Sequence, residues 1–227
     1  MTLTATTLTQ TRPLSAIVQR ELQDVPALTR EKLTVLAGDG ADRALAIGTV
    51  YGKRLFGTPT SDATGNTGNG TIGSIALGPR ARVGDYVIAC VVAATDGGIF
   101  QVTGPDGVSL GLALVGTAFA NDALGFTIAD GATDFVVGDT FTLTVPAGDG
   151  KAVAVDFAAT DGSQVAAGVL GRAVTAPDAI DVTSFGINGY AQLVASELVW
   201  PAGATAGQKT QALADLAARN LIAVEAA

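Results

Sequence analysis

The chain has 227 residues, of which 48% are apolar and 15% are charged, so it is too apolar to be disordered throughout and long enough for one large domain or two small ones. It contains no histidine and a single cysteine, which excludes histidine-dependent catalytic triads, an internal disulfide and any cysteine-based metal site. The net charge of −8 is uneven, because residues 58–150 carry nine Asp against two Arg, whereas residues 1–57 have two more basic than acidic residues. This contrast predicts a separate acidic module in the middle of the chain.

Residues 1–27 are predicted to form an N-terminal arm. Its start, Met1–Gln10, is rich in Thr and has no basic residue and no apolar core of a signal peptide, so we expect no secretory signal. Leu14–Val25 has weak helical spacing of apolar residues and ends at Pro26, which predicts a poorly ordered arm with one short helix. No apolar run approaches the roughly 20 residues of a transmembrane helix, so we expect no membrane contact.

Short β-type runs follow the arm and recur after residue 150. They concentrate Val, Ile, Leu and aromatic side chains between turn residues. The predicted strands of these two segments are residues 31–36, 44–51, 153–157, 164–174 and 190–199.

The C-terminal segment contains the clearest predicted helix, Thr210–Arg219. Thr205 and Gln208 precede it with the spacing of a capping box. Asn220 is suited to the left-handed end of the helix, and a last strand is expected over residues 221–224.

Residues 58–149 are predicted to form an Ig-like β-sandwich. Both ends of this segment are rich in Gly, Thr, Pro and Asp, as linkers are. In one run near its end, Phe141, Leu143 and Val145 alternate with threonines, which is the period of a half-buried strand. The predicted strands of the module are residues 85–92, 98–103, 108–115, 125–129 and 139–145.

Three motifs resemble chemical sites and are better explained by turns and packing. Gly68–Gly73 matches G-x-G-x-x-G, but a dinucleotide site needs a strand before this motif and a helix after it, and here a loop precedes a strand-like run. Asp130–Asp139 clusters carboxylates without the spacing of an EF-hand, so we interpret them as turn-capping residues. Cys90 lies in an apolar run and is predicted to be buried. We therefore expect no catalytic residue, no cofactor and no metal, and, without a basic patch interleaved with aromatics, no nucleic-acid binding.

Three stretches outside the acidic module resemble the head decoration family typified by phage lambda. The stretches are Arg30–Gly38 with Ala46–Lys53, Ala158–Leu170, and Glu197–Thr205 with the helix and the last strand after it. They follow one another in the family's order. The chain departs from the family in its long arm and in the module that interrupts it after Leu55. Because an insertion at a loop tip leaves the parent fold intact when its ends lie close together, we expect residues 28–57 and 150–227 to form one split decoration domain.

The resemblance implies a small, mainly β decoration domain with a C-terminal α-helix, and a structural role in the virion rather than an enzymatic one. It implies a homotrimer at three-fold or quasi-three-fold sites on the outside of an expanded phage head, where it binds the major capsid protein and stabilises the shell. The arm is expected to be ordered against that protein, and its candidate contacts are Thr11, Arg12, Pro13 and Leu14. At the predicted strand-to-helix corner, the candidate anchors of the core or of a subunit interface are Trp200 and Pro201.

Two other functions stay open on the sequence. The acidic module is an alternative virion-surface adhesin or glycan-binding module. A tail-tube or fibre component is the other alternative, and it would form rings or filaments instead of binding a shell. Charge favours an orientation in which the mildly basic N-terminal part faces the shell and the acidic module faces solvent.

Overall fold

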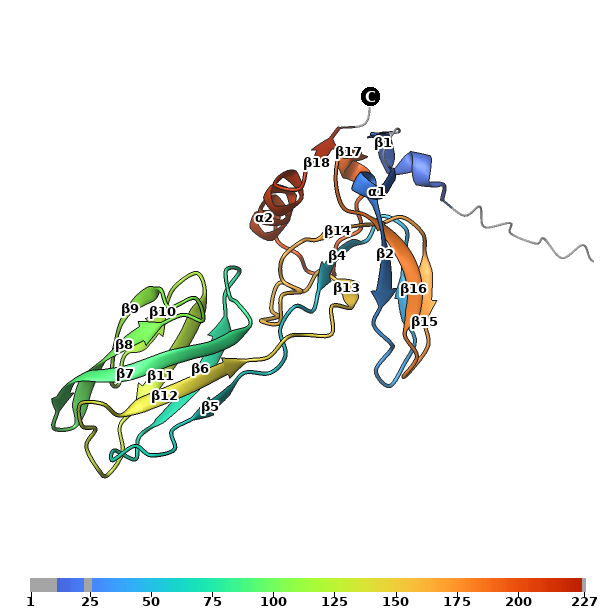
Figure 1. Ribbon diagram of the computed structural model, residues 1–227. Helices are drawn as coiled ribbons and strands as arrows, with labels where there is room; N and C mark the ends of the chain where they lie inside the picture. The colour runs from blue at the N-terminus through green and yellow to red at the C-terminus, as the bar shows by residue number, and fades with distance from the viewer. Residues whose placement is uncertain (1–11, 23–25, 226–227) are drawn as a thin grey trace, which may run out of the picture. The chain divides into compact units, whose positions relative to one another are not determined.

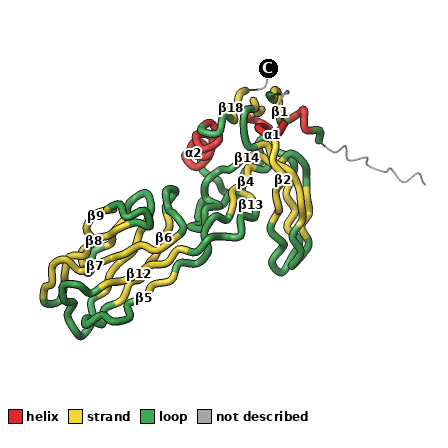
Figure 2. Tube along the Cα trace, in the orientation of Figure 1, coloured by secondary structure: helices red, strands yellow, loops and turns green. Residues whose placement is uncertain are grey.

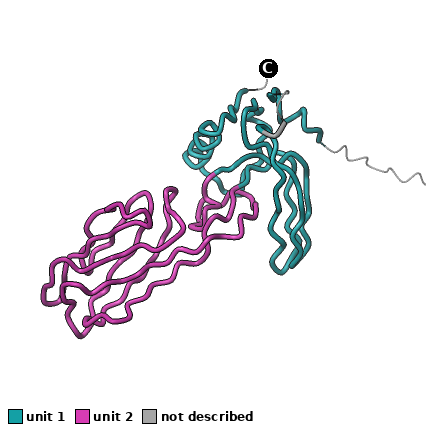
Figure 3. Tube along the Cα trace, in the orientation of Figure 1, with its two compact units in different colours: residues 1–51, 166–227 teal, residues 52–165 magenta. Residues whose placement is uncertain are grey.

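The computed structural model describes residues 12–22 and 26–225, which form two compact units (Figure 1, Figure 3). Unit 1 comprises residues 1–51 and 166–227, and unit 2 is the continuous segment 52–165 between them. Strands dominate the described chain, and its one long helix lies near the C-terminus (Figure 2). The prediction of a mainly β fold with a C-terminal helix is therefore confirmed. Within the described ranges, no helix has both the length and the apolar character to cross a membrane.

Unit 1 contains an antiparallel sheet whose strands come from both of its chain segments. The strands, in order, are β2 (Arg30–Val35), β16 (Val182–Ile187), β14 (Gly168–Leu170) and β4 (Val50–Lys53). Leu33 and Val35 are buried and alternate with exposed residues along β2, so this strand has one face in the core. Strand β2 pairs with β16, about 150 residues later in the chain, so this part of the core depends on long-range pairing.

Tyr51 is the largest fully buried side chain of unit 1. Its hydroxyl donates a hydrogen bond of 2.6 Å to a carboxylate oxygen of Glu31 on β2. Burial, together with this carboxylate, raises the pKa of Tyr51 far above its usual range. A Cβ at either Gly168 or Gly186 would lie 2.5 Å from the Tyr51 hydroxyl oxygen, so the ring fits only because two glycines face it.

A second sheet of unit 1 joins the N-terminal segment to the C-terminus. It has the order β1 (Val18–Glu21), β17 (Ala191–Val194) and β18 (Leu221–Val224), and its last two strands are parallel. Parallel neighbours need a crossover, and α2 (Ala206–Ala217) supplies it. Thr205 and Gln208 form the predicted capping box at the start of α2, which confirms that motif.

The remaining elements of unit 1 are short. They are the 3-10 helices η1 (Leu14–Ala16) and η2 (Ala195–Glu197), the four-residue helix α1 (Pro26–Thr29), and the antiparallel pair β3 (Arg43–Leu45) and β15 (Val174–Ala176).

Unit 2 is mainly a β-sandwich. One sheet has the order β5 (Thr60–Asp62), β12 (Thr140–Val145), β7 (Gly84–Ala94), β8 (Gly97–Thr103) and β9 (Ser109–Leu114). The other has the order β10 (Ala118–Ala120), β11 (Leu124–Ala129) and β6 (Thr71–Leu77), and a further short strand is β13 (Ala152–Ala154). Both sheets contribute to one buried cluster, in which Phe100 lies 5.0 Å from Phe135 and 5.7 Å from Phe141 between ring centroids. Aromatic pairs at such distances add to the stability that their burial provides.

The structure departs from the sequence prediction mainly in unit 1. The helix expected over Leu14–Val25 is wrong for the described residues of this range, because residues 14–16 form a 3-10 turn and residues 18–21 form β1. Hydrogen bonding to β17 outweighs the weak helical spacing. The single strand expected over residues 44–51 is divided into β3 and β4 by a turn with Gly48 at φ 86°.

Candidate interaction surface

The described part of the predicted arm lies on unit 1 itself. Arg12 forms an ion pair with the Glu197 carboxylate, and its guanidinium also donates to the Glu197 carbonyl at 3.3 Å. Pro13 precedes η1, and the half-buried Leu14 begins it. Thr11, the fourth candidate contact of the arm, lies outside the described residues.

Ile17 fixes the root of this segment in the core. It is fully buried, and its carbonyl accepts a hydrogen bond of 2.8 Å from the Val194 N–H on β17. A Cβ at Gly48 would lie 3.1 Å from the Ile17 side chain, so this side chain packs directly on the glycine backbone. Residues 12–22 are therefore an integral part of unit 1, and they do not belong to a free arm.

Trp200 and Pro201 lie in the connection between η2 and α2. The residue before them, Val199, pairs with Thr49 in a parallel bridge, and the Pro201 carbonyl accepts a bond of 3.2 Å from the Ala204 N–H. Trp200 is half-buried, so part of the indole reaches the surface. The structure thus leaves both predicted roles, in the core and at a subunit interface, available to it.

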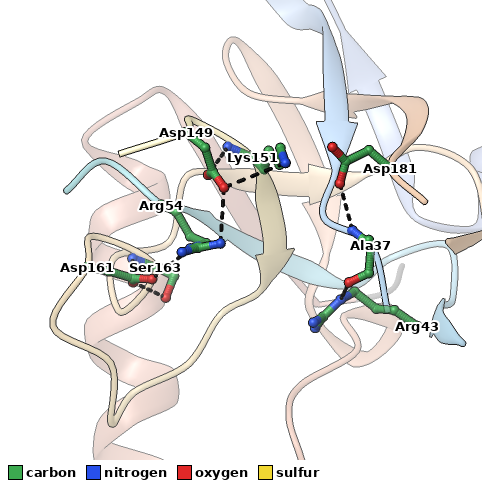
Figure 4. A network of polar contacts seen from close by, with 8 residues as sticks. All are labelled: Ala37, Arg43, Arg54, Asp149, Lys151, Asp161, Ser163 and Asp181. Atoms are coloured by element: carbon green, nitrogen blue, oxygen red, sulfur yellow. Dashed lines mark hydrogen bonds and ion pairs between the residues drawn. The ribbon is translucent and has the colours of Figure 1, made fainter. Parts of the chain in front are cut away.

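Two stretches of chain at the base of unit 2 are joined by ion pairs (Figure 4). The guanidinium of Arg54 lies between two carboxylates, 3.0 Å from Asp149 and 3.2 Å from Asp161. Lys151 also faces Asp149 at 3.8 Å. A single exposed ion pair contributes little to stability. Here Arg54, Asp149, Lys151 and Asp161 form one network, which together stabilises the contact between these stretches.

Backbone hydrogen bonds join the same stretches. The Gly57 N–H donates to the Pro146 carbonyl at 2.9 Å, and Phe56 pairs with Ala147 in an antiparallel bridge. The two ends of the segment 58–145 therefore lie side by side, which is the geometry that tolerates an insertion. The compact units divide at residues 52 and 165, whereas the sequence placed the limits of the acidic module at 58 and 149.

Basic side chains gather on unit 1 around two adjoining hollows. One hollow, of about 320 Å³, has Arg30, Lys32, Arg172 and Phe185 in its lining. The other, of about 280 Å³, is lined in part by Arg20 and again by Arg30. We call Arg20, Arg30, Lys32 and Arg172 the cationic band.

Within the cationic band, only Arg30 has an acidic partner among the described residues. It donates two hydrogen bonds, of 2.8 and 2.6 Å, to Glu21 and lies 5.8 Å from the centroid of the Phe185 ring. The hydrogen bond from Arg30 holds the pKa of Glu21 below its usual value. The side chains of Arg20, Lys32 and Arg172 are exposed, and none forms an ion pair with a described residue.

Unit 2 has the opposite balance of charge. It contains eleven Asp and five basic residues, a net charge of −6. Its arginines all pair with Asp residues of unit 2. Three of its other carboxylates, Asp96, Asp130 and Asp134, are exposed and have oxygens within 4.8 Å of one another. We call these three residues the acidic cluster.

Asp139 confirms the turn-capping interpretation for its part of the run 130–139. It is buried, and its carboxylate accepts the N–H groups of Thr67, Gly68 and Val136 at 2.8, 2.9 and 3.1 Å. Burial alone would raise the pKa of Asp139, but these donors outweigh it, so the pKa lies below its usual value. This carboxylate therefore fastens the loop before β6 to the loop before β12.

The other two motifs also have structural explanations. Gly68 and Gly70 pack on Phe135, and their loop leads into strand β6 rather than into a helix. Cys90 is buried as predicted, and burial raises the pKa of its thiol.

The cationic band was missed by the sequence reasoning. The excess of basic residues in the first 57 positions was a partial signal, since it includes Arg20, Arg30 and Lys32. Arg172 lies 140 positions after Lys32. It joins the band because Phe185 pairs with Lys32 in the β2–β16 ladder and its carbonyl accepts the N–H of Gly171, the residue before Arg172, at 3.0 Å. Only that long-range pairing could have revealed the group.

Comparisons with known proteins point to one family. The family model described as "Bacteriophage lambda head decoration protein D" matches residues 7–221. No curated protein matches the chain. Two crystal structures of Xanthomonas campestris FlgL align with it at 15% and 17% identity and TM-scores of 0.31 and 0.30, over 46% and 45% of this chain and 33% of each FlgL chain. TM-scores of this size do not indicate a shared overall fold.

Proposed function

Because this chain belongs to the bacteriophage lambda head decoration protein D family, we propose that it binds the outer surface of an expanded phage head as a homotrimer at three-fold or quasi-three-fold sites. Membership of the family makes it a structural protein of the phage capsid with a decoration role. The match over residues 7–221 is the observation that carries the proposal. In this role the protein stabilises the shell through contact with the major capsid protein and catalyses no reaction.

Unit 1 is the part that we assign to the shell, and unit 2 is the part that we assign to solvent as an inserted module. Most of the stretches that resemble the family, Arg30–Gly38 and Glu197–Thr205 among them, belong to unit 1. The side-by-side ends of the segment 58–145 support insertion into an older domain. The net charge of −6 on unit 2 favours a position in water.

The capsid-contacting arm is proposed to be the segment that precedes Arg12, with Thr11 at its base. Arg12, Pro13 and Leu14 then act as its root, because the Arg12–Glu197 ion pair holds this point of the chain on unit 1. An arm that adds main-chain hydrogen bonds to a neighbouring protein gains affinity from them and loses ordering entropy.

Co-sedimentation with undecorated shells tests the proposal. The full-length protein is compared with a variant that lacks residues 1–11, which leaves every described contact in place. A second variant, with residues 2–11 replaced by an equally long Gly-Ser stretch, separates the sequence of the arm from its length. Saturable binding to expanded but not unexpanded shells, weakened in both variants, is the expected result. Full-length protein that binds neither form of the shell would contradict the proposal.

A further inference from the structure

The cationic band of unit 1 is a second contact surface. We propose that it binds the acidic unit 2 of a neighbouring copy, through residues that include the acidic cluster. The inference rests on the proposed function, because a shell that carries many copies holds neighbours close together and so strengthens weak contacts between them.

The band has the chemistry of a surface that receives carboxylates. Arg172, Lys32 and Phe185 line the same hollow. Glu31 also lines it, and its carboxylate accepts the hydroxyl of the buried Tyr51. Glu21 already neutralises Arg30, so Arg20, Lys32 and Arg172 keep their charges available. Arginine and carboxylate groups form short, charge-assisted hydrogen bonds when they meet.

Unit 2 offers the matching groups in excess. Its arginines are engaged within unit 2, so its net charge of −6 is not offset locally. The acidic cluster places three exposed carboxylates together, and the Asp134 carboxylate accepts the Asp96 N–H at 3.0 Å, which orients that group. Like charges so close repel one another, and cations from a neighbour would relieve this repulsion.

A contact between two different surfaces of identical chains is heterologous. Such contacts close into a ring when the rotation between copies permits it, and a three-fold ring is the arrangement proposed for this protein. Charge complementarity between the band and unit 2 is a property of this chain alone. If the cationic band bound a segment of the shell instead, that other protein would have to supply the negative charge.

The test uses full-length proteins on expanded shells and compares the wild type with four variants. K32E/R172E reverses two charges of the band, and D96K/D134K reverses two charges of the acidic cluster. K209E/R219E is the matched control, since it changes two other basic residues of unit 1 by the same total charge. The quadruple variant K32E/R172E/D96K/D134K reverses both surfaces and restores their complementarity. All of the exchanged side chains in the band and the cluster are exposed, and circular dichroism verifies that each variant is folded.

Binding isotherms at low and high salt give the result. K32E/R172E and D96K/D134K are each expected to lose cooperative binding and to need roughly 3- to 30-fold more protein for half-occupancy, as the loss of about two exposed ion pairs implies. The quadruple variant is expected to recover cooperativity, the control to keep it, and high salt to abolish the differences.

Several outcomes would overturn the inference. If K32E/R172E weakens binding and the quadruple variant does not recover it, the band contacts the shell or another anion instead of unit 2. If all variants bind like the wild type, the band has no role in binding. If the wild type binds no shell, the proposed function fails, and sedimentation equilibrium of the free protein at low salt then decides the contact by the same four-variant comparison.

Discussion

The two units of this protein are both β-rich, yet they are assembled in different ways. The sandwich of unit 2 folds from one continuous segment, and in it successive strands such as β7, β8 and β9 pair with one another around an aromatic cluster. Unit 1 pairs β2 with β16 and β4 with β14, which lie more than 100 positions apart in the chain. Local pairing folds readily, whereas distant pairing must first close a long loop.

The contacts between the two ends of the segment 58–145 lower the entropy cost of closing the long loop in unit 1. Once unit 2 has folded, the Gly57 N–H and the Pro146 carbonyl are joined by a hydrogen bond. The segment between the two halves of unit 1 then has its ends held together. The effective length of the loop that unit 1 must close is therefore short, and its closure costs less entropy. The difference between the units therefore predicts that a mutation in the core of one unit lowers mainly the stability of that unit. Joining the ends of the segment 58–145 is what lowers the entropy cost of folding unit 1.

The largest expected effect is on the aromatic cluster of unit 2. Phe100→Ala removes a fully buried ring in contact with Phe135 and Phe141, and we expect a loss of about 3–5 kcal/mol from the stability of unit 2. Scanning calorimetry should show the transition of unit 2 at a lower temperature. Phe119→Ala, at a half-buried ring, serves as the control with a smaller shift. Equal shifts of every transition would show that the units do not unfold separately.

A smaller effect is expected from the buried carboxylate of unit 2. Asp139→Asn weakens the acceptor of three backbone N–H groups and should cost about 1–3 kcal/mol near neutral pH. The pKa of Asp139 is lower in the folded state than its unfolded value of about 4, so its contribution is present above that value and is lost as the pH falls through the folded pKa. Wild-type unit 2 should therefore lose stability below about pH 4, relative to the Asn variant. Urea unfolding at a series of pH values checks this, and a constant difference between the two proteins would contradict it.

Unit 1 has its own sensitive point at the start of α2. Thr205→Ala removes the side chain that accepts the Gln208 N–H, and we expect a loss of about 1 kcal/mol from unit 1 alone. Thr205→Ser keeps the acceptor and is the matched control. Hydrogen exchange of the amides of strand β18, measured at increasing urea concentrations, would detect the change. An effect confined to unit 2 would contradict the prediction that the two units respond separately.

The smallest expected effect on stability is at the root of the arm. Arg12→Ala removes a partly exposed ion pair with Glu197 and should cost between about 0 and 1 kcal/mol. Its effect on shell binding should be larger than its effect on thermal unfolding, because the ion pair positions the arm. Lys209→Ala, another basic residue of unit 1, is the control. A large drop in thermal stability would assign Arg12 to the core of the fold instead.

The contrast between local and distant strand pairing also explains which elements could be predicted from the sequence. In unit 2, the alternation of Phe141, Leu143 and Val145 identified β12, and the predicted strands of residues 85–92 and 98–103 correspond to β7 and β8. Strand β6 was recognised only as a strand-like run after the Gly68–Gly73 motif and not counted among the strands, because Gly73 and Ser74, the latter at φ 55°, interrupt its pattern. Such irregular strands are recognised only from their partner.

In unit 1, local signals identified the C-terminal helix and three strands, since the runs predicted over residues 31–36, 190–199 and 221–224 correspond to β2, β17 and β18. The capping box at Thr205 and the left-handed Asn220 mark both ends of α2, and they were evident from residue type. Strand β1 depends on β17, which is about 170 positions away, and no pattern within residues 14–25 reveals that partner. The cationic band was not predicted for the same reason, since its residues come from β1, β2 and the segment after β14, which are distant in the chain.

The most direct test of this account replaces residues 58–145 with a short Gly-Ser turn and measures binding to expanded shells. The hydrogen bond between Gly57 and Pro146 shows that a short turn can span these ends. We expect a folded protein that still saturates the shell, without the cooperativity assigned to unit 2. A folded variant that no longer binds would contradict it, because unit 1 would then not be the part that holds the capsid.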